Sequence, residues 1–140
     1  MKLDFVKAFN SIRRDAVLEA VAQYAPNLLA YTSSSYGAAS SLCFEDEVLL
    51  SEESVQQGDP LAPLLFCLAL HSPISDLKTE FVSGYLDDVG AGGTVLEIIR
   101  EVTQFETRAA AIGLRQMRDS GFKRYLSCCL ASVRPSFCGV

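Results

Sequence analysis

The spacing of apolar and polar residues predicts short strands and helices in alternation along the first part of the chain. Residues 2–9 are predicted to form a short strand in which Asp4 is isolated among apolar side chains. From Ser11 onward apolar residues recur every three to five positions, which predicts a helix that Ser11 caps and Pro26 ends. Residues 27–36 are ambiguous, and their Thr-Ser-Ser-Ser run is typical of a loop.

A hairpin and an apolar helix are predicted next. Residues 41–44 and 47–50 are short apolar runs on either side of a two-residue acidic turn, as expected for paired strands. Asp59 is expected to cap a helix that has Pro60 at its first position. The run that follows is apolar on nearly all sides, which predicts a buried helix, and Pro73 is expected to kink or break it.

The last elements predicted are a strand pair and an amphipathic helix. Residues 81–86 form the first strand, residues 87–88 the turn, and the return strand begins at Val89. Residues 94–97 (Thr-Val-Leu-Glu) have the pattern of a capping box, and Gly113 is a natural stop for the helix that follows. Helices and antiparallel strands on a chain of this size predict an α+β fold, with helices packed on one face of an antiparallel sheet.

Composition fits a folded protein, because 49% of the 140 residues are hydrophobic and 21% are charged. No apolar run reaches the roughly 18 residues that span a bilayer, and the first residues lack the pattern of a signal peptide. We therefore expect a soluble intracellular protein with no membrane partner. The only histidine, His71, is expected to be a half-buried packing residue rather than a ligand.

Charge divides the chain into two parts. Residues 1–114 carry 16 acidic and 7 basic residues, a net charge of −9, whereas residues 115–140 carry 1 acidic and 5 basic residues, a net of +4. Three of the five cysteines also lie in residues 115–140, and their spacing matches neither a disulfide framework nor a zinc site. We interpret residues 1–114 as one domain and residues 115–140 as a divergent, basic, cysteine-containing tail. One interpretation of this tail is an unstructured segment.

Carboxylates recur at positions that suit a cation site. Asp4 lies in the first predicted strand, and Asp87 and Asp88 are adjacent in the turn of a later hairpin. Taken singly, Asp4 could be a solvent-facing strand residue and the pair could be ordinary turn residues. Two adjacent acids repel each other, however, and a cation such as Mg²⁺, which prefers carboxylate oxygen, removes that repulsion.

Three segments in order resemble one family. They are residues 2–10 (Lys-Leu-Asp-Phe-Val-Lys-Ala-Phe-Asn), 57–66 (Gln-Gly-Asp-Pro-Leu-Ala-Pro-Leu-Leu-Phe) and 85–88 (Tyr-Leu-Asp-Asp). The combination resembles the palm domain of reverse transcriptases, most closely those of retrotransposons without long terminal repeats. The resemblance covers about residues 2–114. It implies a palm fold, an antiparallel sheet with a ferredoxin-like or RRM-like core.

The resemblance also implies an activity and a site. The activity is RNA-directed DNA polymerisation, in which two Mg²⁺ ions, replaceable by Mn²⁺, transfer deoxynucleotides to a primer 3′-hydroxyl on an RNA or DNA template. By the same resemblance Asp4, Asp87 and Asp88 are the catalytic carboxylates and metal ligands. Phe5 adds its backbone carbonyl to the metal ligands.

Nucleotide and template contacts are implied for three further residues. Phe9 matches an aromatic gate that excludes a ribose 2′-hydroxyl, although a core aromatic is an equally good interpretation. Gln57 can hydrogen-bond sugar or base, and Gly58 permits close approach of backbone and nucleotide. The alternative for this segment is a well-capped core helix.

The resemblance is incomplete at both ends. The family carries a basic fingers region upstream of the first segment and a thumb downstream, and we expect both to be absent from this chain. Positioning by those regions accounts for much of phosphoryl-transfer catalysis, so we expect the isolated chain to be incomplete as a polymerase. The expected partners are an RNA template, a DNA primer and deoxynucleoside triphosphates. The alternative is a non-catalytic retrotransposon remnant or a binding module that retains the palm fold.

Overall fold

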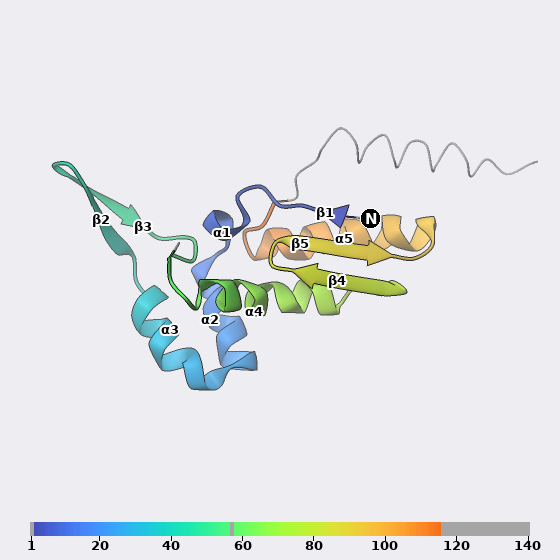
Figure 1. The fold of residues 1–140 in the computed structure, drawn as a ribbon, viewed down its shortest axis with the longest axis horizontal. Coiled ribbons are helices and arrows are strands. Elements are labelled where there is room, and N and C mark those ends of the chain that lie inside the picture. The colour runs from blue at the N-terminus through green and yellow to red at the C-terminus, as the bar shows by residue number, and fades with distance from the viewer. Residues whose placement is uncertain (1, 57, 116–140) are drawn as a thin grey trace, which may run out of the picture.

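The computed structural model describes residues 2–56 and 58–115. Within them, helices alternate with antiparallel strands that form a three-stranded and a two-stranded sheet (Figure 1), which confirms the predicted mixture of α and β structure. The elements are β1 (Lys2–Leu3), α1 (Ala8–Ser11), α2 (Arg14–Tyr24), the 3-10 turn η1 (Pro26–Leu28), α3 (Leu29–Tyr36), β2 (Ser40–Phe44), β3 (Glu47–Ser51), α4 (Ala62–Ser75), β4 (Phe81–Tyr85), β5 (Asp88–Gly92) and α5 (Val95–Ala111).

The three-stranded sheet has the order β1-β5-β4, and both pairings are antiparallel. One of its faces is buried, because Leu3 and Val89 join a core that includes Phe66 of α4 and Phe105 of α5. The opposite face is open, and Tyr85 on it is 78% exposed. Successive strand residues point to opposite faces, so this sheet has one covered and one free surface.

The predicted strand over residues 2–9 is wrong beyond Leu3. Lys7 has a left-handed backbone (φ 48°), and the next four residues form the short helix α1. The helix turns Phe9 toward the core, where its ring stacks on Phe66 at a centroid distance of 4.5 Å. Ser11 is the last residue of α1 rather than the cap of α2, and its hydroxyl donates to the Val6 carbonyl (3.4 Å).

The segment that resembled a loop is helical. α3 covers most of residues 27–36, and its buried residues, Thr32 and Tyr36, are four positions apart on one helix face. Thr32 donates its hydroxyl hydrogen to the Leu28 carbonyl (2.9 Å), so this polar side chain is satisfied within the helix. Burial of one face therefore outweighs the loop character of the serine run.

The predicted hairpin of residues 41–44 and 47–50 is confirmed as β2 and β3, with Phe44 paired to Glu47. It projects from the rest of the described chain (Figure 1). α4 begins at Ala62 rather than at Pro60. Its predicted burial on nearly all sides is wrong, because Leu64 and His71 are exposed.

His71 therefore lies at the surface, with its ring edge-on against Tyr24 (4.7 Å), and is not half-buried. Pro73 is buried inside α4, which continues two residues beyond it. No helix among the described residues is both long enough and apolar enough to cross a membrane.

Both predicted ends of α5 are confirmed. Thr94 and Glu97 form the capping box, and the backbone N–H of Leu114 donates to the Ala109 carbonyl (2.9 Å) after Gly113 turns at φ 90°. α5 ends beside the start of α2. The Arg13 backbone N–H donates to the Ile112 carbonyl (2.9 Å).

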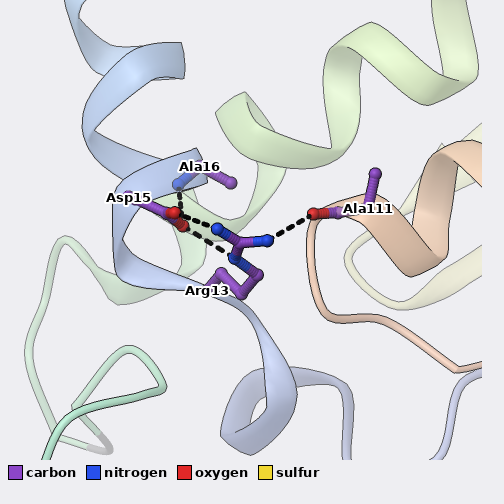
Figure 2. A network of polar contacts seen from close by, with 4 residues as sticks. All are labelled: Arg13, Asp15, Ala16 and Ala111. Atoms are coloured by element: carbon purple, nitrogen blue, oxygen red, sulfur yellow. Dashed lines mark hydrogen bonds and ion pairs between the residues drawn. The ribbon is translucent and has the colours of Figure 1, made fainter.

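The Arg13 side chain makes a second connection between these helices. Its guanidinium binds both Asp15 oxygens and donates to the Ala111 carbonyl (3.4 Å), while Asp15 also accepts from the Ala16 N–H (2.8 Å; Figure 2). The Arg13 hydrogen bond holds the pKa of Asp15 below its ordinary value. Both side chains are more than half exposed, so the ion pair adds little stability but orients Arg13 toward α5.

Candidate functional site

The three predicted carboxylates lie at one end of the three-stranded sheet. Lys2 pairs with Gly90 and Leu3 with Val89, so continuing this antiparallel register places Asp4 opposite Asp88. Leu3 and Val89 are buried, and their neighbours Asp4 and Asp88 are exposed. Strand alternation therefore directs both carboxylates to the open face.

The position of the hairpin turn differs from the prediction. Asp88 is the first residue of β5 and pairs with Tyr85, so the two residues at the turn are Leu86 and Asp87. Leu86 takes the left-handed conformation (φ 55°) that tight hairpins require. The two acids are therefore held in different ways. Strand pairing fixes the position of Asp88, whereas the turn fixes the position of the half-buried Asp87.

Lys2 supplies a positive charge to this group of acids. Its ammonium nitrogen lies 2.9 Å from Oδ1 of Asp88. The hydrogen bond and charge of Asp88 raise the pKa of Lys2, and the charges of Asp4 and Asp87 add to the effect. All three carboxylates therefore act on one ammonium group. Because Lys2 is exposed, the ion pair contributes little to stability, and another cation could replace it.

The donor types suit Mg²⁺, which binds carboxylate and carbonyl oxygen. As they stand, the residues the structure describes contain no group of three or more His, Cys, Asp or Glu side chains that could hold a metal ion. Mg²⁺ is commonly held by one or two carboxylates, with water and substrate phosphates completing its shell. The opposed pair Asp4 and Asp88 meets that smaller requirement in donor chemistry.

The two phenylalanines near Asp4 pack against the core. Phe5 is buried, with its ring 6.0 Å from that of Phe105. Phe9 is half-buried and stacks on Phe66. The contact of one side of its ring with Phe66 therefore supports the interpretation of Phe9 as a core aromatic. Its predicted role as a gate, like the predicted metal contact of the Phe5 carbonyl, stays a prediction.

The middle segment has an exposed glycine at a sharp bend. Gly58 has φ 96°, and a Cβ placed there would meet nothing within 4 Å. The Asp59 N–H donates to the Gln56 carbonyl (3.2 Å), and Oδ1 of Asp59 accepts from the Leu61 N–H (2.8 Å). Asp59 thus orders the approach to α4, although the helix itself starts later than predicted. Gln57 lies outside the described residues.

Sequence reasoning missed two kinds of residue near these segments. Lys2 could have been found from strand alternation, since it lies two positions before Asp4 on the same face. Arg14 and Tyr36 are buried, and the Tyr36 hydroxyl contacts Gln56 and Asp59 on either side of Gly58. The apolar pattern predicted the helix that contains Arg14, whereas the segment that contains Tyr36 resembled a loop. No local pattern links either residue to the middle segment, because the contacts come from distant parts of the chain.

Two comparisons show which known proteins the chain is similar to in sequence. The family model for "Reverse transcriptase (RNA-dependent DNA polymerase)" matches residues 1–117. The chain is also similar to a retrovirus-related Pol polyprotein from the type-1 retrotransposable element R2 of Bradysia coprophila, at 31% identity over 81% of this chain. The alignment spans only 15% of that polyprotein.

Proposed function

The chain belongs to the reverse transcriptase (RNA-dependent DNA polymerase) family, and from that premise we propose that residues 1–114 act as the palm of an RNA-directed DNA polymerase. The observation that carries this proposal is the pairing of Leu3 with Val89, because one further step of that register brings the exposed Asp4 and Asp88 together on the open sheet face. Asp87 lies at the adjoining hairpin turn. Carboxylates from separate elements thus lie at one end of one sheet, as nucleotidyl transfer requires.

Asp4, Asp87 and Asp88 hold two Mg²⁺ ions in this proposal, and the backbone carbonyl of Phe5 adds a further oxygen. When bound, the ions lower the pKa of the primer hydroxyl and neutralise charge on the triphosphate. The Lys2 ammonium group lies 2.9 Å from Oδ1 of Asp88, where it would have to give way if Asp88 held a metal ion. The sheet supplies rigid strands on which these carboxylates keep their spacing.

Substrate selection falls to the residues on either side of the carboxylates. Phe9 excludes a ribose 2′-hydroxyl, while Gln57 and Gly58 contact the incoming deoxynucleotide or the template. The open space around Gly58 supports this assignment, because no described atom beyond the neighbouring residues lies within 4 Å of the position that a Cβ would take.

Template and primer must be bound mainly by segments other than residues 1–114. Residues 1–114 have a net charge of −9, whereas nucleic-acid backbones are bound by Lys and Arg. We propose that basic fingers and thumb segments complete the enzyme. The chain spans about 15% of the length of the R2 polyprotein that it matches, which leaves room for such segments in a polyprotein of that kind.

A second candidate function is a non-catalytic remnant or binding module that keeps this fold. It is favoured by one observation. The described side chains form no group of three metal-binding residues as they stand. Metal-dependent turnover separates the two candidates.

Primer extension with Mg²⁺ or Mn²⁺ tests the proposal, with metal binding followed separately by the Mn²⁺ electron paramagnetic resonance signal. We expect Asp87→Asn to reduce extension by at least about 100-fold, because a carboxylate that binds the ions loses its charge. Asp46→Asn, at the exposed tip of the β2–β3 hairpin, is the matched control and should leave extension unchanged. Extension that survives Asp87→Asn contradicts the assigned site. Mn²⁺ binding without extension is the expected result both for a palm that lacks its fingers and thumb and for a binding module. Loss of Mn²⁺ binding in Asp87→Asn therefore tests the metal site independently of extension, and unchanged Mn²⁺ binding in that variant contradicts it.

A further inference from the structure

Arg14 is a buried cation bound only to uncharged acceptors among the described residues. It is 6% exposed, and each of its guanidinium nitrogens donates one hydrogen bond. Nε donates to the Ser54 carbonyl (3.1 Å), Nη1 to the Ala38 carbonyl (3.0 Å) and Nη2 to the Ser51 hydroxyl (3.1 Å). A planar guanidinium that serves three acceptors fixes their relative positions.

The three acceptors lie on both sides of the β2–β3 hairpin. Ala38 precedes β2, Ser51 ends β3, and Ser54 lies in the connection that leads to α4. Ser54 has a left-handed backbone (φ 73°), and its N–H donates to the Ile12 carbonyl (3.0 Å). The neighbouring Val55 N–H donates to the Phe9 carbonyl (3.3 Å). Arg14 thus clamps the chain where it returns from the hairpin toward the middle segment.

Tyr36 continues this contact toward the middle segment. Its ring centre lies 5.7 Å from Cζ of Arg14, and the residue is 2% exposed. The hydroxyl donates to Oδ2 of Asp59 and accepts from the Gln56 N–H (3.3 Å). Burial, and then the Asp59 hydrogen bond, raises the pKa of Tyr36 to about 12, so the hydroxyl keeps its proton throughout the neutral range.

One hydroxyl therefore joins the two residues that flank the bend. We call Gln56, Gly58 and Asp59 the Gly58 corner. The Tyr36 hydroxyl contacts its first and last residues, while Gly58 at φ 96° is open to solvent. The buried side of the corner is fixed by polar contacts, and its exposed side is free to meet a ligand.

We propose that Arg14 and Tyr36 are positioning residues that hold the Gly58 corner in the conformation that binds the incoming nucleotide. The inference rests on the proposed function, because it assigns the corner to nucleotide contact. Neither residue touches the nucleotide. Both residues lower the entropic cost of ordering the backbone that contacts the nucleotide. Preorganisation of this kind strengthens binding.

The decisive variant is Tyr36→Phe in the full 140-residue chain, because it removes one hydroxyl and keeps the buried ring. A fluorescent deoxynucleoside triphosphate is titrated with Ca²⁺, and Mn²⁺ binding at the carboxylates is measured in parallel. We expect nucleotide affinity to fall about tenfold, equivalent to about 1.4 kcal/mol, with Mn²⁺ affinity unchanged within about twofold. Tyr31→Phe, on the same helix but 48% exposed, is the matched control and should change neither affinity.

Arg14→Lys provides a second variant with the charge retained. An ammonium group cannot reproduce the planar, three-acceptor geometry, so nucleotide affinity should fall by a similar factor. Hydrogen exchange of the Gln56 and Asp59 amides should become faster in both variants, because the corner loses its buried contacts.

The outcomes distinguish failure of this inference from failure of the proposed function. Wild-type affinity in Tyr36→Phe overturns the inference and leaves the proposed function standing. A parallel loss of Mn²⁺ binding also overturns it, because the residue then acts on the whole fold. If the wild-type chain binds no nucleotide, the proposed function fails first and the inference falls with it.

Discussion

At the scale of single residues, two glycines share a left-handed backbone but differ in their surroundings. Gly113 turns at φ 90° where α5 ends, and a Cβ there would lie 2.3 Å from the Ser11 carbonyl oxygen. Gly58 turns at φ 96°, with nothing within 4 Å of its missing Cβ. Gly113 is therefore required both by its φ and by close packing, whereas Gly58 is required by φ alone.

Alanine substitution should separate these two requirements. We expect Gly58→Ala to lower the free energy of unfolding by about 1 kcal/mol, the cost of a left-handed alanine. Gly113→Ala should cost about 1–3 kcal/mol more, because the new methyl group overlaps backbone that cannot rotate away. Urea denaturation followed by circular dichroism measures both. Equal losses in the two variants would show that the α5–α1 packing is looser than the structure indicates.

At the scale of elements, the capping box decides where β5 stops and α5 starts. The Thr94 N–H and hydroxyl both donate to Oε2 of Glu97 (3.0 and 2.8 Å). The Thr94 hydroxyl and backbone bonds lower the pKa of Glu97 from its ordinary 4.5. This boundary lies just beyond Gly92, which pairs with Phe81 of β4, at the end of the sheet away from the carboxylates.

Loss of the cap should destabilise the chain in a pH-dependent way. We expect Thr94→Ala to lower the free energy of unfolding by about 1 kcal/mol at pH 7. Because the pKa of Glu97 is lowered in the folded state, its contribution is fully present above pH 4.5 and is lost as the pH falls through the folded pKa. The difference between wild type and variant should therefore shrink as the pH falls below 4.5 and through the lowered pKa of Glu97.

Thermal unfolding at several pH values measures this difference. Thr103→Ala serves as the control, because Thr103 is exposed inside α5 and its hydroxyl donates to the Ile99 carbonyl in the same helix. A Thr94→Ala penalty that stays constant down to pH 3 would assign the stabilisation to the threonine alone and not to its Glu97 partner.

At the scale of the whole molecule, the sheet separates packing from chemistry. Its covered face carries the apolar core, and its open face carries Lys2 and the exposed carboxylates. The surrounding charge is strongly acidic, with a net of −9 over residues 1–114. Such a surface attracts divalent cations and repels nucleic-acid phosphates.

Binding of a primer–template duplex should therefore be weak and should depend on divalent cations. We expect the full chain to bind with a Kd above about 10⁻⁶ M in 50 mM salt, and more tightly when Mg²⁺ is added. Fluorescence anisotropy over a salt series measures the affinity and its salt dependence. Tight, steeply salt-dependent binding without Mg²⁺ would show that this chain itself binds the duplex. It would contradict the proposal that basic segments elsewhere do so.

Local patterns predicted the elements whose stabilising contacts are close in sequence. The hairpin over residues 41–44 and 47–50 and the capping box of α5 follow from neighbouring residues, and both are confirmed. The prediction was wrong where contacts between residues far apart in sequence determine the local conformation. Burial of Tyr36 favours a helix over the serine run, and stacking on Phe66 accompanies a helical turn at Phe9.

The sequence by itself determined the family and the three acidic positions, because residue type and order are one-dimensional properties. Only the tertiary structure decided that Leu3 pairs with Val89, that Lys2 binds Asp88, and that the hairpin turns at Leu86 and Asp87. These facts depend on the register between β1 and β5 and between β4 and β5. Register is set by burial of Leu3 and Val89 in a core assembled from the whole chain, so no local pattern contains it.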